Sequence, residues 1–501
     1  MKKGLVLLLL CALCLGALTG CGDIAIGPAP AAPSAQSGSA SAPAAPASGG
    51  IEPAGVSVIT LSGSGAKASG GGVSVSGSVV TIASPGEYSV SGTLDDGCIV
   101  VNTGEVKGDV RLTLDGASVT CLSGAAIRVE QAKNFDLVLA DGTQNRLVSG
   151  TQSDTVEEKL EGAALFSEDD VDILGSGSLE ICGYLNNGIT CKDDLDILGG
   201  TLVVTAVNNG IKGSESVEIT GGEISVTAGN DGIKSTSARK EGKGYVLISG
   251  GTVAVESVGD GISAETTMEI SGGAISVTTT GDRELVSSKA LKAKGALTVS
   301  GGELTLVSED HAIHSTSDLA VTGGTLSVLS REGKGFSSHA VLTISGGTID
   351  LRSGDDGIEA LSALAISDGE ITVLAGADGL KAGNKETASG TLDISGGTIK
   401  VNAYGDAIDA KTAASISGGS FVGTGTSKRP QGFAGGTQCS VLFSFPGAAD
   451  SVAQVQDESG AVIGEIASSC AYTYALFSSP ELAPGSCRLV CGTLEAAAAA
   501  N

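Results

Sequence analysis

A glycine pair recurs through the chain at steps of mostly 22 or 23 residues, with a few steps of 28 or 29. The pairs stand at 199–200, 221–222, 250–251, 272–273, 301–302, 323–324, 346–347, 396–397 and 418–419, and Asp368-Gly369 fills the one gap. A fixed period of this length is typical of repeat proteins, in which each unit packs only on its neighbours. The 501 residues therefore need not divide into several globular domains.

Each repeat contains three short segments with alternating apolar residues, which is the pattern of strands with one buried face. One segment precedes the glycine pair, as in 195–197, and one follows it, as in 201–204. The third has the form Asn/Asp-Gly-Ile, as in 187–189 and 231–233. Because parallel crossovers are strongly right-handed, we predict an all-β, right-handed parallel β-helix with three short strands per coil. A β-sandwich array explains the strands but not the period, and a left-handed hexapeptide helix requires a period divisible by six.

The first residues have the layout of a lipoprotein signal. Met1-Lys2-Lys3 is followed by an apolar run from Leu5 to Leu18 that is too short for an ordinary membrane span. The sequence Leu18-Thr19-Gly20-Cys21 has the form of a lipobox, in which the cysteine thiol accepts lipid. We predict a signal peptide at 1–20, lipidation of Cys21, and a flexible linker through residue 50 that is rich in Ala, Pro and Ser. The mature protein is then expected outside the cytoplasm, anchored to the membrane by its lipid at the cell surface.

The rest of the chain divides by how regular its repeat is. We predict an N-terminal cap with irregular first coils at 51–170, a regular parallel β-helix at 171–430, and a C-terminal β cap at 431–495, where the repeat ends and phenylalanines appear. A cap would cover the edge that an open β-helix otherwise exposes. The expected state is a monomer.

The formal net charge of −27 argues against nucleic acid as a partner and favours divalent cations. Eight cysteines remain once Cys11, Cys14 and Cys21 are set aside, and an exported chain permits disulfides between them. Cys98 and Cys121 lie about one coil apart, so they are candidates for stacking on each other, although the pairing as a whole stays open.

Polar residues two positions before the recurrent isoleucine should stack into a ladder when the coils are wound. Its members are Asn187, Asn209, Asp231, Asp260, Lys289, His311, Lys334, Asp356, Asp378 and Asp406, with an adjacent ladder of Asn186, Asn208, Asn230, Asp310 and Asp355. Stacked carboxylates repel each other unless a cation bridges them, and Ca²⁺ takes six to eight oxygen ligands. We therefore expect calcium at this seam, with Asn187, Asn209, Asn230, Asp231, Asp260, Asp355 and Asp356 as ligands, together with Asp193 and Asp194. The first choice of site is the cluster of Asn187, Asp193, Asp194, Asn209 and Asp231.

A structural explanation of the same residues is that Asn and Asp suit a tight corner, with glycine supplying a positive φ. Catalytic motifs are weak: Gly354-Asp355-Asp356 matches only part of a polygalacturonase signature, and no arrangement of arginines or lysines marks a lyase base. His311 and His314 flank the usual corner and are explained as substitutions there. No catalytic residue is assigned.

An ordered set of motifs resembles the bacterial carbohydrate-binding β-helix proteins, typified by a clostridial surface protein that binds cellulose-like and pectic polysaccharides. The resemblance runs from about residue 57 to 492 and includes Ile82 to Gly92, Leu112 to Gly116, Phe166 to Asp170, Lys192 to Leu195, Gln431 to Phe433 and Ser478 to Leu482. It implies a right-handed β-helix like that of pectate lyases, bound calcium, and polysaccharide binding without established cleavage. The absence of tryptophan argues against a flat aromatic strip for crystalline cellulose.

Together these features predict a non-catalytic surface lipoprotein that binds a polysaccharide, with an acidic, pectin-like or other plant or host glycan favoured. Two alternatives stay open: a calcium-dependent polysaccharide lyase or hydrolase, and a structural adhesion protein.

Overall fold

The structure is a computed structural model that describes residues 55–106, 108–151, 162–387 and 389–501. The expected signal peptide, Cys21 and the linker lie outside the described residues. The described residues form strands and no helix. None of their segments is a helix of the length and apolarity that crossing a membrane requires.

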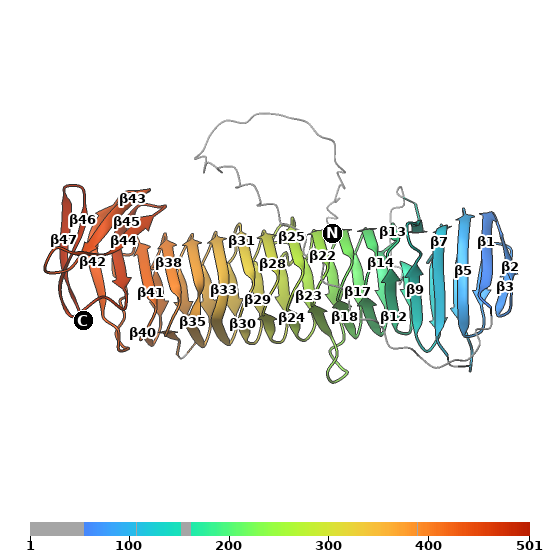
Figure 1. Ribbon diagram of the computed structural model, residues 1–501, viewed down its shortest axis with the longest axis horizontal. Helices are drawn as coiled ribbons and strands as arrows, with labels where there is room; N and C mark the ends of the chain where they lie inside the picture. Colours follow the sequence, from blue (N-terminus) through green and yellow to red (C-terminus); the bar gives the residue numbers. More distant parts are fainter. Residues whose placement is uncertain (1–54, 107, 152–161, 388) are drawn as a thin grey trace, which may run out of the picture. The chain divides into compact units, whose positions relative to one another are not determined.

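From residue 171 to 425, the strands repeat in three sets (Figure 1). The strands before the glycine pair are β12 (Val171–Gly175), β15 (Asp194–Ile197), β18 (Ser216–Ile219), β21 (Tyr245–Ile248), β24 (Met268–Ile270), β27 (Leu297–Val299), β30 (Leu319–Val321), β37 (Thr391–Ile394) and β40 (Ala413–Ile416). Those after it are β13 (Ser178–Gly183), β16 (Thr201–Ala206), β19 (Glu223–Ala228), β22 (Thr252–Ser257), β25 (Ala274–Thr279), β28 (Glu303–Ser308), β31 (Thr325–Ser330), β38 (Thr398–Ala403) and β41 (Ser420–Gly425). In two coils these sets merge into β33 (Val341–Ser353) and β35 (Ala363–Ala375).

The third set carries the Asn/Asp-Gly-Ile motif and related sequences. It comprises β14 (Asn187–Cys191), β17 (Ile211–Gly213), β20 (Ile233–Ser235), β23 (Ile262–Ala264), β26 (Leu291–Ala293), β29 (Ile313–Ser315), β32 (Phe336–Ser338), β34 (Ile358–Ala360), β36 (Leu380–Ala382) and β39 (Ile408–Ala410). These strands belong to a 15-stranded sheet, and the other two sets belong to a 28-stranded sheet. Through these coils each strand pairs in parallel with the equivalent strand one repeat later, as Ile211 with Ile233 and Leu202 with Ile224. The predicted vertical stacking of equivalent positions is therefore present.

Most strands before residue 171 also pair in parallel with the next coil, as β5 does with β7, whereas the first strand pairs and the strands after 425 depart from this rule. The first strands are β1 (Ser57–Gly63), β2 (Ala66–Ser69), β3 (Val73–Ser76), β4 (Val79–Ile82), β5 (Gly86–Leu94), β6 (Cys98–Asn102), β7 (Val110–Cys121), β8 (Ile127–Gln131), β9 (Phe135–Leu139), β10 (Gln144–Ser149) and β11 (Ala163–Ser167). Leu165 pairs with Ile127 on one side and Ile189 on the other, so both occupy the expected isoleucine position. The β1–β2 and β3–β4 pairs are antiparallel.

The last strands are β42 (Ser440–Gly447), β43 (Ser451–Gln456), β44 (Val462–Ser468), β45 (Tyr472–Ser478), β46 (Gly485–Cys491) and β47 (Leu494–Ala500). β45 pairs antiparallel with β41, the last strand of its set. The pairing covers the edge of the stack, and β43, β44, β46 and β47 form a four-stranded sheet beside it. Phe443, Phe445, Tyr472 and Phe477 are buried in a separate apolar cluster there.

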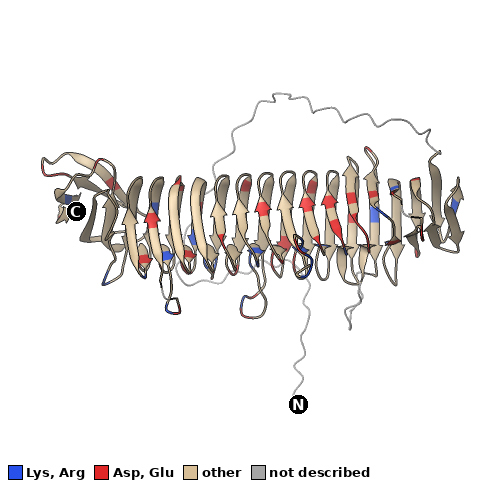
Figure 2. Cartoon of the chain, turned by 90° about the horizontal axis from the view of Figure 1, so that it is seen from below, with Lys and Arg blue, Asp and Glu red and all other residues tan. Residues whose placement is uncertain are grey.

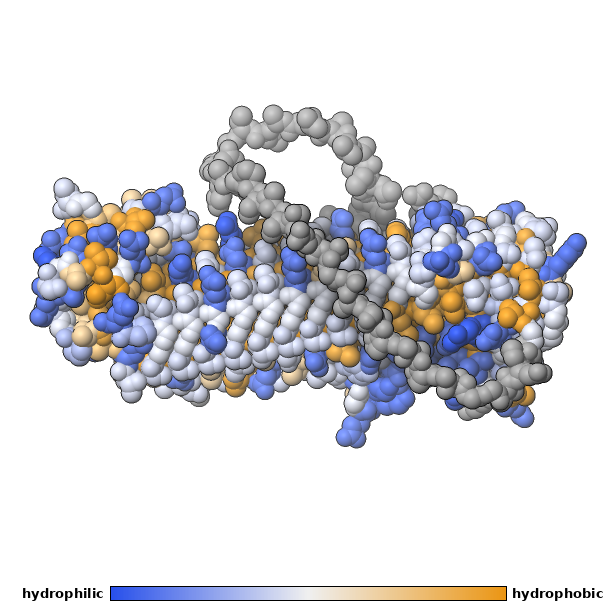
Figure 3. Space-filling model, viewed as in Figure 1, coloured by the Kyte–Doolittle hydropathy of each residue, from blue (hydrophilic) through white to orange (hydrophobic). Residues whose placement is uncertain are grey.

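Alternation along the strands places one apolar row inside the stack. In β19, for example, Ile224, Val226 and Ala228 are buried while the residues between them are exposed. One continuous core runs from Ile59 to Leu476 and is dominated by Ile, Val and Leu. On the face shown in Figure 3, the middle coils present mostly hydrophilic residues and residues of intermediate hydropathy. The burial of these aliphatic rows is the main favourable contribution to folding.

The glycines serve two different purposes. The second glycine of each pair has a positive φ, for example +90° at Gly222 and +93° at Gly347, as a tight turn requires. The glycine of the Asn/Asp-Gly-Ile motif does not, so the explanation that it supplies a positive φ is wrong. A Cβ on Gly232 would lie 2.2 Å from Val255 Cγ1 and 2.6 Å from the carbonyl oxygen of Gly261. Glycine is needed there because neighbouring backbone and side chains pack too closely for a larger residue.

All eight cysteines of the described residues are thiols in the structure. The backbone N–H of Gly97 donates to the carbonyl of Thr120 at 2.8 Å, and that of Leu122 donates to Asp96 Oδ1 at 3.1 Å. These bonds place Cys98 beside Cys121, and the interaction between the two thiols raises the pKa of Cys98 and lowers that of Cys121.

We expect Cys98 and Cys121 to form a disulfide when the protein meets a disulfide-exchange oxidant, because neighbouring strands bring cysteines within bonding reach. Mass spectrometry of unreduced peptides should show the two segments linked. Cys191 is the internal control, since its thiol donates to the carbonyls of Asp169 and Asp194 and should remain free. Unlinked Cys98 after full oxidation would contradict the expectation.

Candidate functional site

The middle residue of each short strand in the 15-stranded sheet points away from the core. We call these residues the outer ladder: Thr190, Lys212, Lys234, Ser263, Lys292, His314, Ser337, Glu359, Lys381 and Asp409, each paired with the next. All are polar, yet each is buried or half-buried, because neighbouring ladders and loops shield them. Shielded polar groups along one face are typical of ligand sites.

The ladder expected to hold calcium lies beside the outer ladder, and its members stack as predicted. Six of these side chains accept a backbone hydrogen bond from the next coil; for example, Asn209 N–H donates to Asn187 Oδ1 at 3.0 Å, and Asp260 N–H donates to Asp231 Oδ1 at 2.9 Å. The same bond recurs from Lys289 to Asp260, from Lys334 to His311 Nδ1, from Asp378 to Asp356 and from Asp406 to Asp378. We call these residues the corner ladder. Its side chains join consecutive coils.

The adjacent asparagines are engaged in the same way. Asn208 Nδ2 donates to Asn186 Oδ1 at 2.7 Å, and Asn230 Nδ2 donates to Asn209 Oδ1 at 3.1 Å. Asn187 Oδ1 also accepts from Asn209 Nδ2. Two of the expected calcium-binding amide oxygens, those of Asn187 and Asn209, are therefore hydrogen-bonded within the protein.

Lysines of the outer ladder neutralise the carboxylates of the corner ladder. Lys234 Nζ lies 2.5 Å from Asp231 Oδ2, Lys292 Nζ lies 2.7 Å from Asp260 Oδ2, and Lys381 Nζ lies 3.1 Å from Asp356 Oδ2. Burial raises the pKa of Asp356, and the charges of Lys381 and Lys334 oppose that rise. An ammonium group thus stands where the sequence predicts a calcium ion, and Asp231, Asp260 and Asp356 do not fit a calcium site.

A groove of about 600 Å³ opens where the outer ladder meets the loop after β36. The acids that line it are Asp355, Asp356, Glu359, Glu386 and Asp409, and the cations are Lys334, Lys381, Lys385 and Lys411. Lys334 is ion-paired with Glu359, whereas Lys385 is exposed and makes no ion pair within the described residues. Lys411 Nζ donates to the loop carbonyls of Asn384 and Thr387. The groove therefore offers an unpaired ammonium group at Lys385, a partly bonded one at Lys411 and fixed carboxylates to a ligand, and Figure 2 shows the loops that protrude from the stack.

The three histidines of the chain gather on this face, with ring centroids 5.5 Å apart for His311 and His314 and 5.0 Å apart for His314 and His339. Burial lowers the pKa of His311 to about 4 and of His314 to about 3, so both imidazoles are neutral near pH 7. The buried His314 Nδ1 has no hydrogen-bond partner within the described part of the chain. A buried polar atom without a hydrogen bond destabilises the folded state unless a ligand or water forms the missing bond.

Asp193 and Asp194 stand at a different corner from Asn187, so the structure divides the first-choice cluster. Asp194 N–H donates to Asp170 Oδ1 at 3.1 Å, and Asp194 is ion-paired with Lys243. Burial raises the pKa of Asp193, and the neighbouring carboxylates of Glu215 and Asp170 add to the rise. Lys243 pairs with Asp194 and Glu215, and Lys240 pairs with Glu215, so Asp170 and Asp193 are the carboxylates of this corner that make no ion pair among the described residues. No group of three or more His, Cys, Asp or Glu side chains in the described ranges is already arranged as a metal site.

A further acidic ladder lies on the strands that precede the glycine pair. Asp136, Asp172, Asp196 and Glu218 pair in register on four neighbouring strands. Arg111 neutralises Asp136 at one end, and Tyr245 donates to Glu218 at the other. Burial raises the pKa of Asp196 to about 6, and the charges of Glu218 and Asp172 add to the rise.

We expect Asp196→Asn to stabilise the protein at neutral pH. The folded state holds a proton on Asp196 up to about pH 6, whereas the unfolded chain releases it near pH 4, so stability falls as pH rises through this window. The gain at pH 7.5 should be about 1 kcal/mol, because solvent screens a half-exposed carboxyl. Thermal unfolding of both proteins at pH 4 and pH 7.5 measures it.

The matched control is Glu269→Gln. Glu269 occupies the same ladder beyond Leu247, is exposed, and has no adjacent carboxylate in the ladder. Its replacement should leave the melting temperature unchanged at both pH values. An equal gain at pH 4 and pH 7.5 for Asp196→Asn would contradict the assignment.

Sequence patterns did not reveal the outer ladder. The ladder position carries Thr, Lys, Ser, His, Glu or Asp, so no recurrent residue type marks it. Its signal is positional: it directly follows the recurrent isoleucine, whose side chain points inward, and residues alternate along a strand. The corner ladder was found because Asn and Asp recur there.

A family model described as "Carbohydrate-binding domain-containing protein" matches residues 76–332 and 317–458. A curated protein of the same description from Acetivibrio thermocellus is 36% identical over 129 residues, which are 25% of this chain and 45% of that protein, so the match spans about half the length of the relative. A solved structure, the gadolinium derivative of the polysaccharide lyase-like protein from C. thermocellum, is 35% identical and covers 49% of this chain and 96% of its own, with a TM-score of 0.45. The family matches extend over most of the coils described above, and the chain belongs to the family of carbohydrate-binding domain-containing proteins.

Proposed function

We propose that the protein binds an acidic polysaccharide on the outer ladder without cleaving it. The supporting observation is the groove beside β34 and β36, where Lys385 and Lys411 are exposed next to Asp355 and Asp409. Ammonium groups pair with the carboxylates of uronic acids, and aspartates accept hydrogen bonds from sugar hydroxyls. A pectin-like chain of uronates offers both kinds of group in every residue.

The lysines that line the groove are better suited to binding a ligand than to acting as the base of a cleavage reaction. Lys334 is ion-paired with Glu359, and Lys381 is ion-paired with both Asp356 and Asp378. A lysine that acts as a base must lose its proton, and paired carboxylates favour the protonated form. We therefore assign these lysines to holding the face together and Lys385 and Lys411 to contacting the ligand.

The wider setting of the proposal follows from the sequence. The coils are taken to wind right-handed, as a parallel β-helix, and a lipid on Cys21 would hold the protein outside the cytoplasm at the cell surface, as a monomer. Calcium is proposed at the corner of Asp170, Asp193 and Glu215, where burial raises the pKa of Asp193 and the neighbouring carboxylates of Glu215 and Asp170 add to the rise. The ion would bind Asp170 and Asp193, which make no ion pair within the described residues, beside Glu215, whose charge Lys240 and Lys243 already balance.

Retention on immobilised polygalacturonate tests the binding. Lys385→Ala combined with Lys411→Ala should weaken binding at least about tenfold, because two charge-assisted contacts are lost. Lys67→Ala combined with Lys400→Ala changes the net charge equally at exposed positions away from the groove and should bind as the parent does. Loss of retention in the control as well, or no retention of the parent, would refute the proposal. Release of unsaturated ends that absorb ultraviolet light would refute its non-catalytic part.

Calorimetric titration with Ca²⁺ tests the metal. Binding should be lost in Asp193→Asn and kept in Asp115→Asn, which removes one exposed carboxylate elsewhere. Chelation should lower the melting temperature of the parent and leave that of Asp193→Asn unchanged. Equal titration of both variants would show that the ion is not at this corner.

A further inference from the structure

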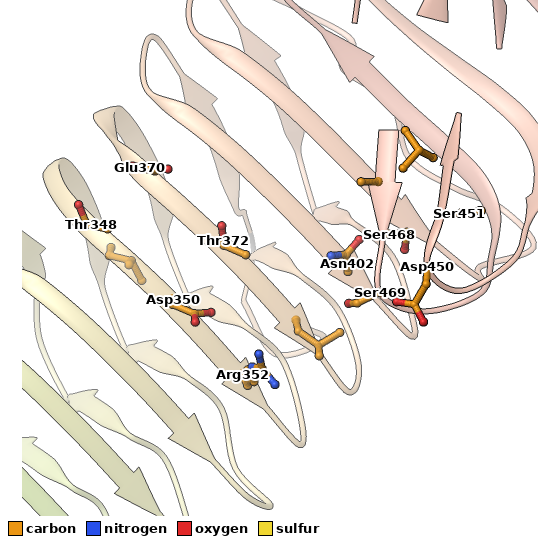
Figure 4. A pocket seen from close by; sticks show the side chains of 14 residues that line it. Thr348, Asp350, Arg352, Glu370, Thr372, Asn402, Asp450, Ser451, Ser468 and Ser469 are labelled. Atoms are coloured by element: carbon orange, nitrogen blue, oxygen red, sulfur yellow. The ribbon is translucent and has the colours of Figure 1, made fainter. Parts of the chain in front are cut away.

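A second groove, of about 630 Å³, lies on the outward face of the strands that follow the glycine pair (Figure 4). One wall is made by β33, β35 and β38, and the other by the chain around β43 and β44 in the C-terminal sheet. Its size falls within the range of about 300–1,000 Å³ usual for ligand sites. The polar residues that line it are Thr348, Asp350, Arg352, Glu370, Thr372, Asn402, Asp450, Ser451, Ser468 and Ser469.

Strand register fixes the order of these side chains. Asp350 pairs with Thr372, and Arg352 pairs with Leu374, which pairs in turn with Asn402. Figure 4 shows Asp350 and Arg352 on one strand and Asp450 with Ser469 on the opposite wall. Asp450 has a φ of 58°, the one positive value outside glycine among the described residues. Such a conformation costs energy in a non-glycine residue, and the surrounding structure holds it here.

The charged groups of this groove are unpaired among the residues that the structure describes. Asp350, Arg352, Glu370 and Asp450 make no side-chain hydrogen bond or ion pair within the ranges that the structure describes, although Asp350 and Arg352 share one strand face. Elsewhere on the molecule, strand-borne charges are commonly paired along the ladders, as Arg146 is with Glu180 and Arg111 with Asp136. Four unpaired charges in one groove leave their full bonding capacity for a ligand.

The composition of the walls selects the chemistry of that ligand. No aromatic ring lines the groove, so a sugar cannot stack there, and charge must supply most of the affinity. Three carboxylates stand against one guanidinium, which gives a net charge of −2 from the lining. Lys400 lies one strand beyond Thr372 and lines a neighbouring groove. Uronates would be repelled, whereas an ammonium group would be attracted.

We propose that this groove binds an oligosaccharide of amino sugars that carry free ammonium groups. Asp350, Glu370 and Asp450 pair with the ammonium groups, and Arg352 and Asn402 donate hydrogen bonds to ring hydroxyls. The groove is separate from the outer ladder and has the opposite charge preference. One chain would thereby hold an acidic glycan on one face and a cationic glycan on another.

Calorimetry with a glucosamine tetramer, at a pH where its amines are protonated, tests the proposal. The parent should bind it at least about tenfold more tightly than the N-acetylated tetramer, which has the same hydroxyls and no charge. Asp350→Asn combined with Asp450→Asn should abolish the difference. The control, Glu223→Gln combined with Glu303→Gln, removes two exposed carboxylates, each at the same strand position as Glu370 but outside the groove, and should bind as the parent does.

Each alternative outcome is informative. Equal binding of both tetramers would overturn the charge argument. Equal weakening by the control would show attraction to the overall charge of −27 rather than to the groove. Failure of the outer-ladder proposal is recognised separately, because Lys385→Ala with Lys411→Ala should leave glucosamine binding unchanged while polygalacturonate retention is measured in parallel.

Discussion

Phe336→Ala should destabilise the protein by about 3–5 kcal/mol, the usual cost of removing a buried aromatic ring. Phe336 is fully buried and occupies the recurrent isoleucine position, between Ile313 and Ile358. The coils above and below are held by their own hydrogen bonds, so they cannot collapse into the cavity. The loss should appear as a lower melting temperature in calorimetry.

Phe336→Leu is the matched variant, because leucine stands at this position in other coils, as at Leu291 and Leu380. It retains most of the apolar volume and should cost clearly less, about 1.5 kcal/mol or below. In a stack of coils, each unit is stabilised mainly by its neighbours, so the alanine variant should also broaden the unfolding transition. A cost under about 1 kcal/mol for alanine would mean that the inner row is loosely packed.

Asp356→Ala should also destabilise strongly, although it removes a negative charge from a chain of net charge −27. Asp356 is 3% exposed, accepts the backbone N–H of Asp378 at 3.1 Å, and contacts both Lys334 and Lys381. Relief of long-range repulsion is small because salt screens it, whereas breaking a buried ion pair costs about 3–5 kcal/mol. We expect the local loss to dominate and the melting temperature to fall.

Two comparisons separate the contributions. Asp356→Asn keeps an acceptor for the Asp378 N–H and removes only the charge, so its cost should be intermediate. Asp115→Ala removes an exposed carboxylate and should leave the melting temperature unchanged or slightly raised. Stabilisation by Asp356→Ala would show that overall repulsion outweighs the buried pair.

Much of the coil architecture was predictable because a repeat carries its own register. Equivalent residues 22 apart, such as Ile211 and Ile233, stack because each strand pairs with the next copy of itself. The stacking of the corner ladder follows from the same spacing. Its chemistry did not follow from the sequence. The backbone N–H groups that six of its side chains bind, and the lysines that neutralise Asp231, Asp260 and Asp356, lie in place only when the coils are stacked.

The glycine of the Asn/Asp-Gly-Ile motif shows the same limit. Local sequence suggests a turn with a positive φ, which is the commonest reason for glycine after Asn or Asp. The structure instead places Gly232 against Val255 and Gly261, residues from the next coil. A steric requirement imposed by a neighbouring strand has no local signal in the sequence.

Sequence alone determined the period, the inward row of aliphatic residues and the positions that stack, because these depend on hydrophobic alternation and on a repeat that pairs with itself. The tertiary structure decided which charges meet, and therefore where a ligand finds unpaired groups. Arg352 and Asp450 face one groove although about a hundred residues separate them, since the C-terminal sheet folds back beside the last coils. Non-periodic contacts of this kind are set by packing between segments and leave no pattern along the chain.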